Sequence, residues 1–296
     1  IETKTNHDVK AVEYFIREEM GKFSNLKKYQ HLVHFALTSE DINSLSYAVL
    51  LRDAIDIYIK KLDILIKDLK SKSRSWASLP LLARTHGQAA SPSTVGKEIK
   101  VFHHRLTRQK DILKKMKPLA KFGGATGNFH TLDLSDAKID WVSKANKFLA
   151  SFKVELSPVT TQIEPHDGIA EISHCIQRIN SILIDLNQDM WMYIANDIFK
   201  LKLQDGEIGS STMPHKVNPI DFENSEGNLG LSSSLMNFFA DKLTKSRLQR
   251  DLSDSTVMRN LGVGFGYSYL GITSCMNGLT KIQPNKKNAR KELSDN

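Results

Sequence analysis

The chain has 296 residues, with 41 Lys and Arg against 33 Asp and Glu, which gives a formal net charge of +8 at pH 7. Hydrophobic residues at 40% and charged residues at 25% are globular values, and they exclude a disordered or collagen-like chain. Without a run of about 18 apolar residues, the sequence predicts no membrane-spanning helix and no membrane partner. Two cysteines, Cys175 and Cys275, are too few for a disulfide framework and favour a reducing cytoplasm. Because the chain begins at Ile1 without an initiator Met or a signal core, we expect it to belong to a longer gene product.

The positive charge is compatible with a nucleic-acid-binding protein or with an enzyme that attracts small anions. The basic residues gather in two runs, and neither contains the interleaved aromatic residues that stack on bases. A solvated helix face is therefore the better interpretation of both runs, and we expect no nucleic-acid partner. The runs are Lys114, Lys115, Lys117 and Lys121, and Lys286, Lys287, Arg290 and Lys291.

The first long element is a helix predicted from near Ser39 to about Arg74. Apolar residues recur alternately three and four positions apart over 45–69, with one polar exception at Arg52, a spacing that only a helix places on one face. Just ahead of it, Thr38 and Asp41 have the Thr-x-x-Asp form of a capping signal. A helix of this length greatly exceeds the mean for globular proteins.

Three further long helices are predicted downstream, over 95–116, 169–193 and 219–245. The first two repeat the helical apolar period. The third begins where Asn218 can cap a helix and Pro219 suits its first position. The sequence therefore predicts an all-α bundle of very long helices, whose apolar seams favour association between subunits. A helical solenoid is the alternative, but no repeat of fixed period is present.

Strand signals are almost absent from the chain. The apolar runs 79–82 and 154–156 are the only candidates, and both are weak. The glycine-rich run 123–127 does not follow a strand pattern, so we interpret it as a turn between two helices and not as a nucleotide-binding loop. Zinc motifs such as HExxH or paired CxxC do not occur, and no metal site is predicted.

The breaks between the predicted helices hold most of the unusual polar residues, in segments 5–8, 31–41, 83–88 and 206–226. In the last segment, adjacent hydroxyl residues precede Lys216 and the predicted helix start. Free backbone N–H groups, the helix dipole and a lysine together form an anion site, where the hydroxyl of Ser210 could act as a base. A mobile Ser/Gly loop ahead of a capped helix explains the same residues.

Several histidines lie in these breaks. His86, in the turn Arg-Thr-His-Gly-Gln, has the residue type of a general acid or base, although a lone histidine is more often structural. The same alternative applies to His7 and His34. The adjacent pair at 103–104 lies within a predicted long helix and is interpreted as partly exposed surface.

The run Ser-Ser-Thr-Met-Pro-His-Lys-Val-Asn-Pro at 210–219, followed by Glu223, resembles the signature loop of the fumarase/aspartase superfamily. Within this superfamily the chain is most similar to the bacterial-type adenylosuccinate lyases. The resemblance extends in collinear order over essentially the whole chain. The supporting segments are 6–8, 34–41, 84–88, 161–167, 250–251 and 255–260.

This resemblance implies a C–N lyase without cofactor or metal that releases fumarate by β-elimination in purine biosynthesis. Its expected substrates are adenylosuccinate, which yields AMP, and the succinylaminoimidazole carboxamide ribotide SAICAR, which yields AICAR. Elimination next to a carboxylate requires a base, an acid for the leaving nitrogen and positive charge around the carboxylates. By resemblance Ser210 is the base, His86 is the acid, Lys216 with Asn218 stabilises the intermediate, and Glu223 supports His86 or another nearby polar group.

Further site residues are implied by matched family positions. His7 is assigned to the catalytic group, and His34 is a weaker candidate near the same site. The implied substrate-binding residues are Asn6, Asp8, Thr38, Ser39, Gln162, Ser211, Val217, Asn218, Asn224, Arg250, Ser255, Thr256, Val257, Met258 and Arg259.

The resemblance also implies a homotetramer whose active sites are shared between subunits. It predicts the end of an N-terminal helical domain at 1–26, a central long-helix domain at 27–280, and the start of a C-terminal helical domain at 281–296. The alternatives are another superfamily lyase, such as an argininosuccinate lyase, or a catalytically silent basic binding protein.

Overall fold

The computed structural model describes residues 1–202 and 217–295, which are mostly helical. The helices are α1 (Glu2–Thr5), α2 (Asp8–Gly21), α3 (Ser24–Lys27), η1 (Gln30–Leu32), α4 (Ser39–Ser75), α5 (Val95–Leu113), α6 (His130–Ser135), α7 (Trp141–Ser151), α8 (Asp167–Ala195), α9 (Ile220–Leu243), α10 (Ser253–Met258), α11 (Leu261–Lys281) and α12 (Lys286–Ser294). The strands are β1 (Pro80–Thr85), β2 (Gln88–Thr94), β3 (Leu119–Ala120), β4 (Glu155–Leu156), β5 (Phe199–Leu201) and β6 (Ile282–Pro284). The predicted all-α class is confirmed.

Contacts divide the chain into two compact units. The first unit comprises 1–53, 117–169 and 242–256, and the second comprises 54–116, 170–241 and 257–296. The domains predicted at 1–26, 27–280 and 281–296 were inferred from the family resemblance and not from contacts, so they stay a prediction. Among the described helices, none is both long and apolar enough to cross a membrane.

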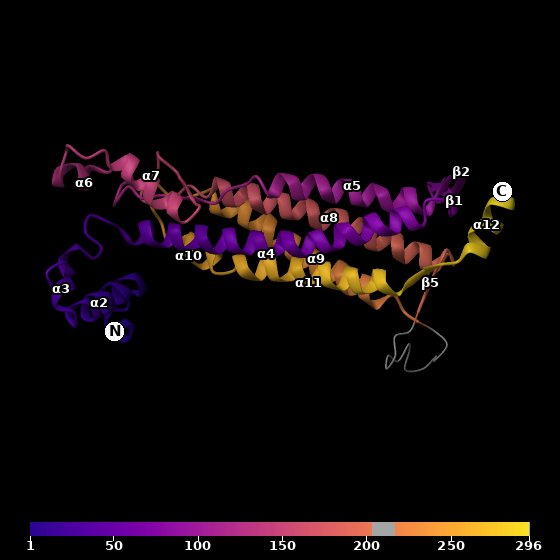
Figure 1. Ribbon diagram of the computed structural model, residues 1–296, viewed down its shortest axis with the longest axis horizontal. Coiled ribbons are helices and arrows are strands. Elements are labelled where there is room, and N and C mark those ends of the chain that lie inside the picture. Colours follow the sequence, from indigo (N-terminus) through magenta and orange to yellow (C-terminus); the bar gives the residue numbers. More distant parts are fainter. Residues whose placement is uncertain (203–216, 296) are drawn as a thin grey trace. The chain divides into compact units, whose positions relative to one another are not determined.

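In the second unit, α5, α8, α9 and α11 run lengthwise beside the later part of α4 (Figure 1). Each of these helices buries one apolar face against its neighbours, as at Leu62 in α4 and Leu183 in α8, which are both 0% exposed. Polar contacts between helices lie inside this core. The hydroxyl of Tyr58 is 2.9 Å from that of Ser268, and the amide of Asn180 donates to Ser232 over 3.0 Å. The four predicted long helices, three of them from periodicity and the one at 219–245 from its start signals, are therefore confirmed in this bundle, which also contains α11, a helix that the sequence did not predict.

The helix after the signature segment differs slightly from its prediction. α9 begins at Ile220, and the carbonyl of Pro219 accepts hydrogen bonds from the backbone of Phe222 at 3.0 Å and Glu223 at 3.3 Å. The sequence predicted Pro219 as the first helical residue, whereas in the structure it directly precedes the first helical residue, Ile220. The proline ring needs no N–H partner at either position, which is why the sequence alone does not distinguish them.

Both weak strand candidates are strands in the structure, as parts of β1 and β4, but their partners were not predicted. The segment Ser91-Pro92-Ser93, just ahead of the helix predicted over 95–116, lies in β2, where Pro92 pairs with Leu82 of antiparallel β1. A two-stranded ribbon leaves one edge of each strand unpaired, so a proline is tolerated there. The glycine-rich run lies between β3 and α6, not between two helices as predicted.

Of the two basic runs, the one at 286–291 lies on the exposed face of α12, as predicted. The interpretation of the other run is wrong for Lys121, whose side chain is 0% exposed and contacts the carboxylate of Asp41. α5 ends at Leu113, ahead of this run. The chain then passes through β3 into the core of the first unit, which carries Lys121 inside.

Candidate functional site

The start of α4 is fixed to the glycine turn of the first unit by a buried ion pair. The backbone N–H of Thr38 donates to Oδ2 of Asp41 over 2.8 Å, and Oδ1 of Asp41 accepts from the N–H of Gly124 at 3.2 Å. The ammonium of Lys121 lies 2.9 Å from the same Oδ1 and donates to the carbonyl of Gly124 at 2.6 Å. Gly124 has a φ of 76°, which glycine adopts without strain. One carboxylate thus positions the predicted substrate segment that begins at Thr38.

Burial lowers the pKa of Lys121, while the adjacent Asp41 carboxylate acts against that shift. Both side chains are 0% exposed, so neither charge has water as an alternative partner. Removing one partner of such a pair leaves an uncompensated buried charge. The pair is therefore a structural anchor for the start of α4.

His7 and Ser39, predicted from separate segments, come together in the first unit. His7 caps α2, where its Nδ1 accepts from the backbone N–H of Lys10 at 3.3 Å. Its Nε2 lies 3.5 Å from the hydroxyl of Ser39, the first residue of α4. Asn6, with a left-handed φ of 49°, ends α1 and turns the chain, and Asp8 is exposed in the first turn of α2. The structure thus brings an imidazole, a hydroxyl and a carboxylate to the starts of two helices.

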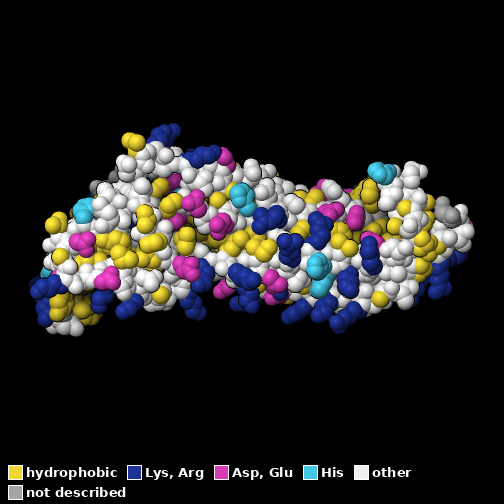
Figure 2. Space-filling view, turned by 90° about the horizontal axis from the view of Figure 1, so that it is seen from above, with side chains coloured by type: hydrophobic (Ala, Val, Ile, Leu, Met, Phe, Trp, Pro, Cys, Tyr) yellow, Lys and Arg dark blue, Asp and Glu magenta, His cyan; other side chains and the backbone are white. Residues whose placement is uncertain are grey.

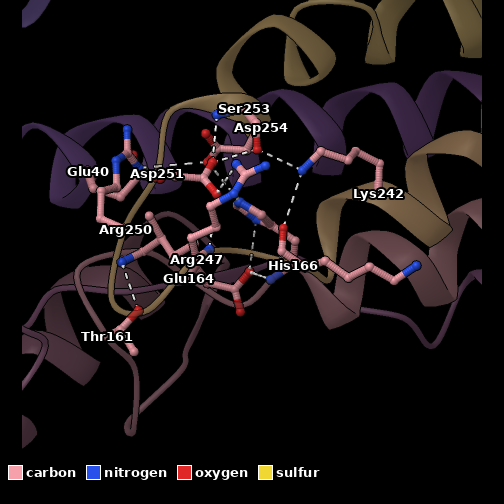
Figure 3. Close-up of polar contacts among 12 residues, drawn as sticks. Glu40, Thr161, Glu164, His166, Lys242, Arg247, Arg250, Asp251, Ser253 and Asp254 are labelled. Carbon is pink, nitrogen blue, oxygen red and sulfur yellow. Dashed lines mark hydrogen bonds and ion pairs between the residues drawn. The ribbon is translucent and has the colours of Figure 1, made fainter.

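Arg250 is held by a chain of buried charges, drawn in Figure 3. Its Nη1 lies 3.0 Å from Oε2 of Glu40 and 3.7 Å from Oδ2 of Asp254. The imidazole of His166 connects Asp254, 3.5 Å from its Nε2, with Glu164, 3.4 Å from its Nδ1. Glu40, Glu164, His166 and Asp254 are buried, whereas the Arg250 side chain is 25% exposed. The guanidinium is therefore the part of this network that can meet a ligand.

The charge state of the network depends on His166. Burial by itself lowers the pKa of His166, but its contacts with Asp254 and Glu164 outweigh burial and raise it to about 9. Burial also raises the pKa of Asp254, and the contacts with His166 and Arg250 outweigh it, so that pKa is lowered. Burial raises the pKa of Glu40, against the opposing effect of Arg250. At neutral pH the network therefore contains an imidazolium between two carboxylates.

We expect the first unit to lose stability as the pH rises from about 6.5 to 9. The folded-state pKa of His166, about 9, lies above the value of about 6.5 for an unfolded histidine, so its contribution is complete below about pH 6.5 and disappears as pH passes 9. Urea unfolding at several pH values, for the protein and for His166→Gln, measures this. In His166→Gln the free energy of unfolding should depend less steeply on pH over this range. The same pH dependence in both proteins would contradict the raised pKa of His166.

Three further predicted residues of the first unit, Gln162, Ser255 and Thr256, are close in sequence to members of this network. Gln162 is half-buried in the loop between Thr161 and α8. This loop packs closely on the glycine turn, because a Cβ added at Gly127 would collide with the carbonyl oxygen of Thr161. Ser255 is half-buried in α10, directly after Asp254, and exposed Thr256 follows it. His34, the weaker candidate, is half-buried and has a left-handed φ of 66° in the loop before α4.

In the second unit, His86 occupies the tip of a β-hairpin. Thr85 of β1 pairs with Gln88 of β2, so the two-residue loop consists of His86 and Gly87 with φ values of 55° and 75°. Positive φ at both central positions is typical of a type I′ hairpin turn. His86 is a non-glycine residue in this conformation, and its side chain is exposed. The hairpin therefore extends the imidazole away from the core of its own unit.

The remaining predicted residues of the second unit lie around α9 and α10. Exposed Glu223 accepts a hydrogen bond from the indole of Trp191 at 3.1 Å, and exposed Asn224 follows it. Val217 and Asn218 are half-buried ahead of α9, Val257 and Met258 are buried at the end of α10, and Arg259 is exposed. Ser210, Ser211 and Lys216 lie outside the described residues.

Sequence reasoning missed the buried part of the site, His166 with its carboxylates and Lys121 with Asp41. One usable signal was Lys121 itself, a single lysine between apolar residues in the segment Leu-Ala-Lys-Phe. For His166 the position directly before α8 was visible, but its partner Asp254 is remote in sequence. Among residues 1–202 and 217–295, no group of three or more His, Cys, Asp or Glu side chains is arranged to hold a metal ion.

A family model described as lyase matches residues 1–231, and one described as adenylosuccinate lyase C-terminal matches 246–296. The adenylosuccinate lyases of Escherichia coli K12 and Legionella pneumophila Corby are each 48% identical to this chain over its whole length. The chain spans 65% of the length of these two relatives.

Two solved structures share the fold. The 3-carboxy-cis,cis-muconate lactonizing enzyme from Pseudomonas putida has a TM-score of 0.82 and 21% identity, over 99% of this chain and 64% of that one. The fumarate lyase from Mesorhizobium sp. BNC1 has a TM-score of 0.74 and 18% identity, over 89% of this chain and 59% of that one.

Proposed function

This chain belongs to the lyase family of the fumarase/aspartase superfamily, among the adenylosuccinate lyases, and we propose that the protein eliminates fumarate from adenylosuccinate to give AMP. The observation that carries the proposal is the 48% identity to adenylosuccinate lyases along the entire chain, with Ser210, Lys216 and His86 all present. We extend it to SAICAR, which carries the same succinyl group on nitrogen. Both reactions belong to purine biosynthesis, and two free, buried cysteines favour a cytoplasmic location.

In the proposed mechanism, Ser210 removes a proton from the carbon next to a succinyl carboxylate. The electron pair forms the carbon–carbon double bond of fumarate as the C–N bond breaks, and His86 donates a proton to the departing nitrogen. Lys216 and Asn218 stabilise the negative charge that develops on the carboxylate. Glu223 has a supporting role and orients nearby polar groups; one of these is the indole N–H of Trp191, which donates a hydrogen bond to it.

The first unit supplies groups for the substrate's anions. Arg250 offers a partly exposed guanidinium, and His7 and Ser39 offer a ring nitrogen and a hydroxyl within 3.5 Å of each other. A guanidinium matches the fork geometry of carboxylate and phosphate. We assign carboxylate, ribose or phosphate binding to these three residues and to the neighbouring Thr38, Gln162 and Ser255.

An ultraviolet assay of the purified protein tests the proposed function. We expect adenylosuccinate to be converted to AMP and fumarate. Absence of turnover with adenylosuccinate, together with consumption of argininosuccinate or malate, would move the protein to another branch of the superfamily.

We propose that the protein assembles as a homotetramer with active sites shared between subunits. Three helices of the second unit carry exposed apolar residues seven positions apart: Ile57 and Ile64 in α4, Leu231 and Phe238 in α9, and Val263 and Leu270 in α11. A spacing of seven places both residues of a helix on one face, as in a helix–helix seam. His86, exposed at its hairpin tip, needs groups from another subunit to enclose it, because acid catalysis is strongest where water is excluded.

Leu231→Glu is expected to dissociate the tetramer, because it places a charge in an apolar seam. Light scattering during size-exclusion chromatography measures the mass. The matched control is Leu134→Glu, which alters a leucine that is 86% exposed outside these stripes. A tetramer that survives Leu231→Glu, or dissociates equally in Leu134→Glu, would reject this interface.

A further inference from the structure

A groove of about 440 Å³ between α4 and α5 in the second unit has four Lys or Arg residues and one histidine among its nine lining residues, and no acidic one. Its basic residues are Lys70, Arg74, Lys97, Lys100 and His103. Figure 2, which views the molecule from above, shows Lys and Arg side chains gathered on the side where α5 lies, with histidine among them. We call this surface the α4–α5 groove.

The two helices face each other in regular steps of seven residues. At one step Lys110 of α5 contacts Asp63 of α4 at 2.8 Å. Seven residues later in α4 and seven residues earlier in α5, Lys70 and His103 line the same groove. After seven more, Gly96 lies so close to Ala77 that a Cβ added at Gly96 would meet the backbone nitrogen of Ala77 at 2.6 Å. The groove therefore lies between the Lys110–Asp63 ion pair at one end and the close contact of Gly96 with Ala77 at the other.

Elsewhere on these two helices, some cations of the described residues have carboxylate partners and others, such as Lys60 and Arg108, do not; the groove differs in that its cations gather from both helices around one hollow. Lys72 pairs with Asp68 at 2.8 Å and Lys110 with Asp63. Within the groove Lys97 pairs with Glu98 at 3.0 Å, whereas none of the ion pairs among the described residues includes Lys70, Arg74 or Lys100. Like charges that face one another without a counter-charge are unfavourable, and a cleft lined by one sign of charge concentrates counter-ions. This part of the seam therefore offers positive charge to a ligand.

His103 responds to the same field. Burial lowers its pKa first, and the neighbouring groups Lys70, His104, Lys100 and Arg74 lower it further. An anion placed among these cations cancels that repulsion and raises the pKa of the imidazole. Binding of an anion is thus coupled to uptake of a proton by His103, which supplies a readout that is independent of catalysis.

We propose that the α4–α5 groove binds a small polyanion with several phosphate groups in a row, such as the oligophosphate part of a nucleotide or free inorganic polyphosphate. Arg74 supplies a guanidinium fork for one phosphate, and Lys70, Lys100 and His103 supply further donors. The basic residues extend over 70–74 of α4 and 97–103 of α5, roughly 6 Å and 9 Å at 1.5 Å per residue, which is longer than a single phosphate or carboxylate. The site lies outside the residues assigned to elimination.

Calorimetric titration of the full-length protein with sodium tripolyphosphate at low salt tests the proposal. We expect saturable binding that weakens roughly tenfold or more, equivalent to about 1.4 kcal/mol, in the double variant Lys70→Gln/Lys100→Gln. Near pH 6, titrations in buffers of different ionisation enthalpy should reveal uptake of a fraction of a proton, which His103→Gln abolishes. His174→Gln, which changes an exposed histidine of α8 that is not among the groups lining the groove, should leave the uptake unchanged.

The matched charge control is Lys286→Gln/Lys287→Gln, which removes the same charge from the exposed face of α12. Equal weakening in both double variants, no change in the groove variant, or no binding at all would overturn the proposal. With ATP as a second probe, the same loss in the groove variant identifies a nucleotide as a source, while loss with tripolyphosphate alone identifies the inorganic ion. Duplex DNA that binds more tightly than tripolyphosphate, and through the same lysines, would also overturn it.

Discussion

Ser210→Ala and His86→Ala are each expected to lower kcat by roughly 10²–10⁴-fold, the range for loss of a general base or acid. Ser210 is the single base proposed and His86 the single acid, so no other proposed residue replaces either one when it is removed. Steady-state measurement of AMP formation gives kcat and KM separately. Because the two groups act in one transition state, the double variant should lose little more than the worse single variant.

Two controls distinguish lost chemistry from a disturbed fold. Ser234→Ala and His104→Ala change the same residue types at exposed positions of α9 and α5 and should retain normal kcat. The pH–rate profile of His86→Ala should also lose the limb that reports protonation of the acid. Near-normal turnover in Ser210→Ala would reject its role as the base.

Lys121→Met is expected to lower the free energy of unfolding by about 3–5 kcal/mol, the range for breaking a buried ion pair by removal of one partner. Asp41 would then carry a buried charge whose remaining donors are the backbone N–H groups of Thr38 and Gly124. Urea denaturation measures the loss. Hydrogen exchange at these two amides locates it at the start of α4.

The comparison variant is Lys117→Met, from the same basic run. Lys117 contacts Glu155 at 2.6 Å, but both side chains are more than half exposed, so this pair is worth about 1 kcal/mol or less. Equal losses in the two variants would show that the Lys121–Asp41 pair is no stronger than a surface contact. Unchanged exchange at Thr38 and Gly124 in Lys121→Met would reject the anchoring of the substrate segment.

Much of the fold followed from local sequence. The start predicted for α4 at Ser39 was correct because the Thr38–Asp41 signal is local, and the side chain of Asp41 does accept from the N–H of Thr38. Helical periodicity located α5 and α8, since three- and four-residue spacing reports directly which face is buried, and the Asn218–Pro219 start signal located α9 to within one residue. β2 was missed because its partner β1, and not its own composition, makes it a strand.

The candidate site divides in the same way. Ser210, His86 and Lys216 were found from short motifs in which residue type and spacing carry the chemistry. The buried groups were not, because their roles depend on partners far along the chain: Asp41 meets Lys121, and His166 meets Asp254. Spacing in sequence holds no information about such pairs. Chain folding alone decides whether a charge is solvated or buried beside an opposite one.

The sequence by itself determined the family, the long-helix class and the residues proposed for proton transfer, because each rests on local periodicity or a contiguous motif. Only the tertiary structure showed that Lys121 is inside the protein and that Arg250 is held by carboxylates. It also showed which part of the net charge of +8 lines the α4–α5 groove. The physical reason is that electrostatic energy depends on distance and burial, and neither is fixed until remote segments pack together.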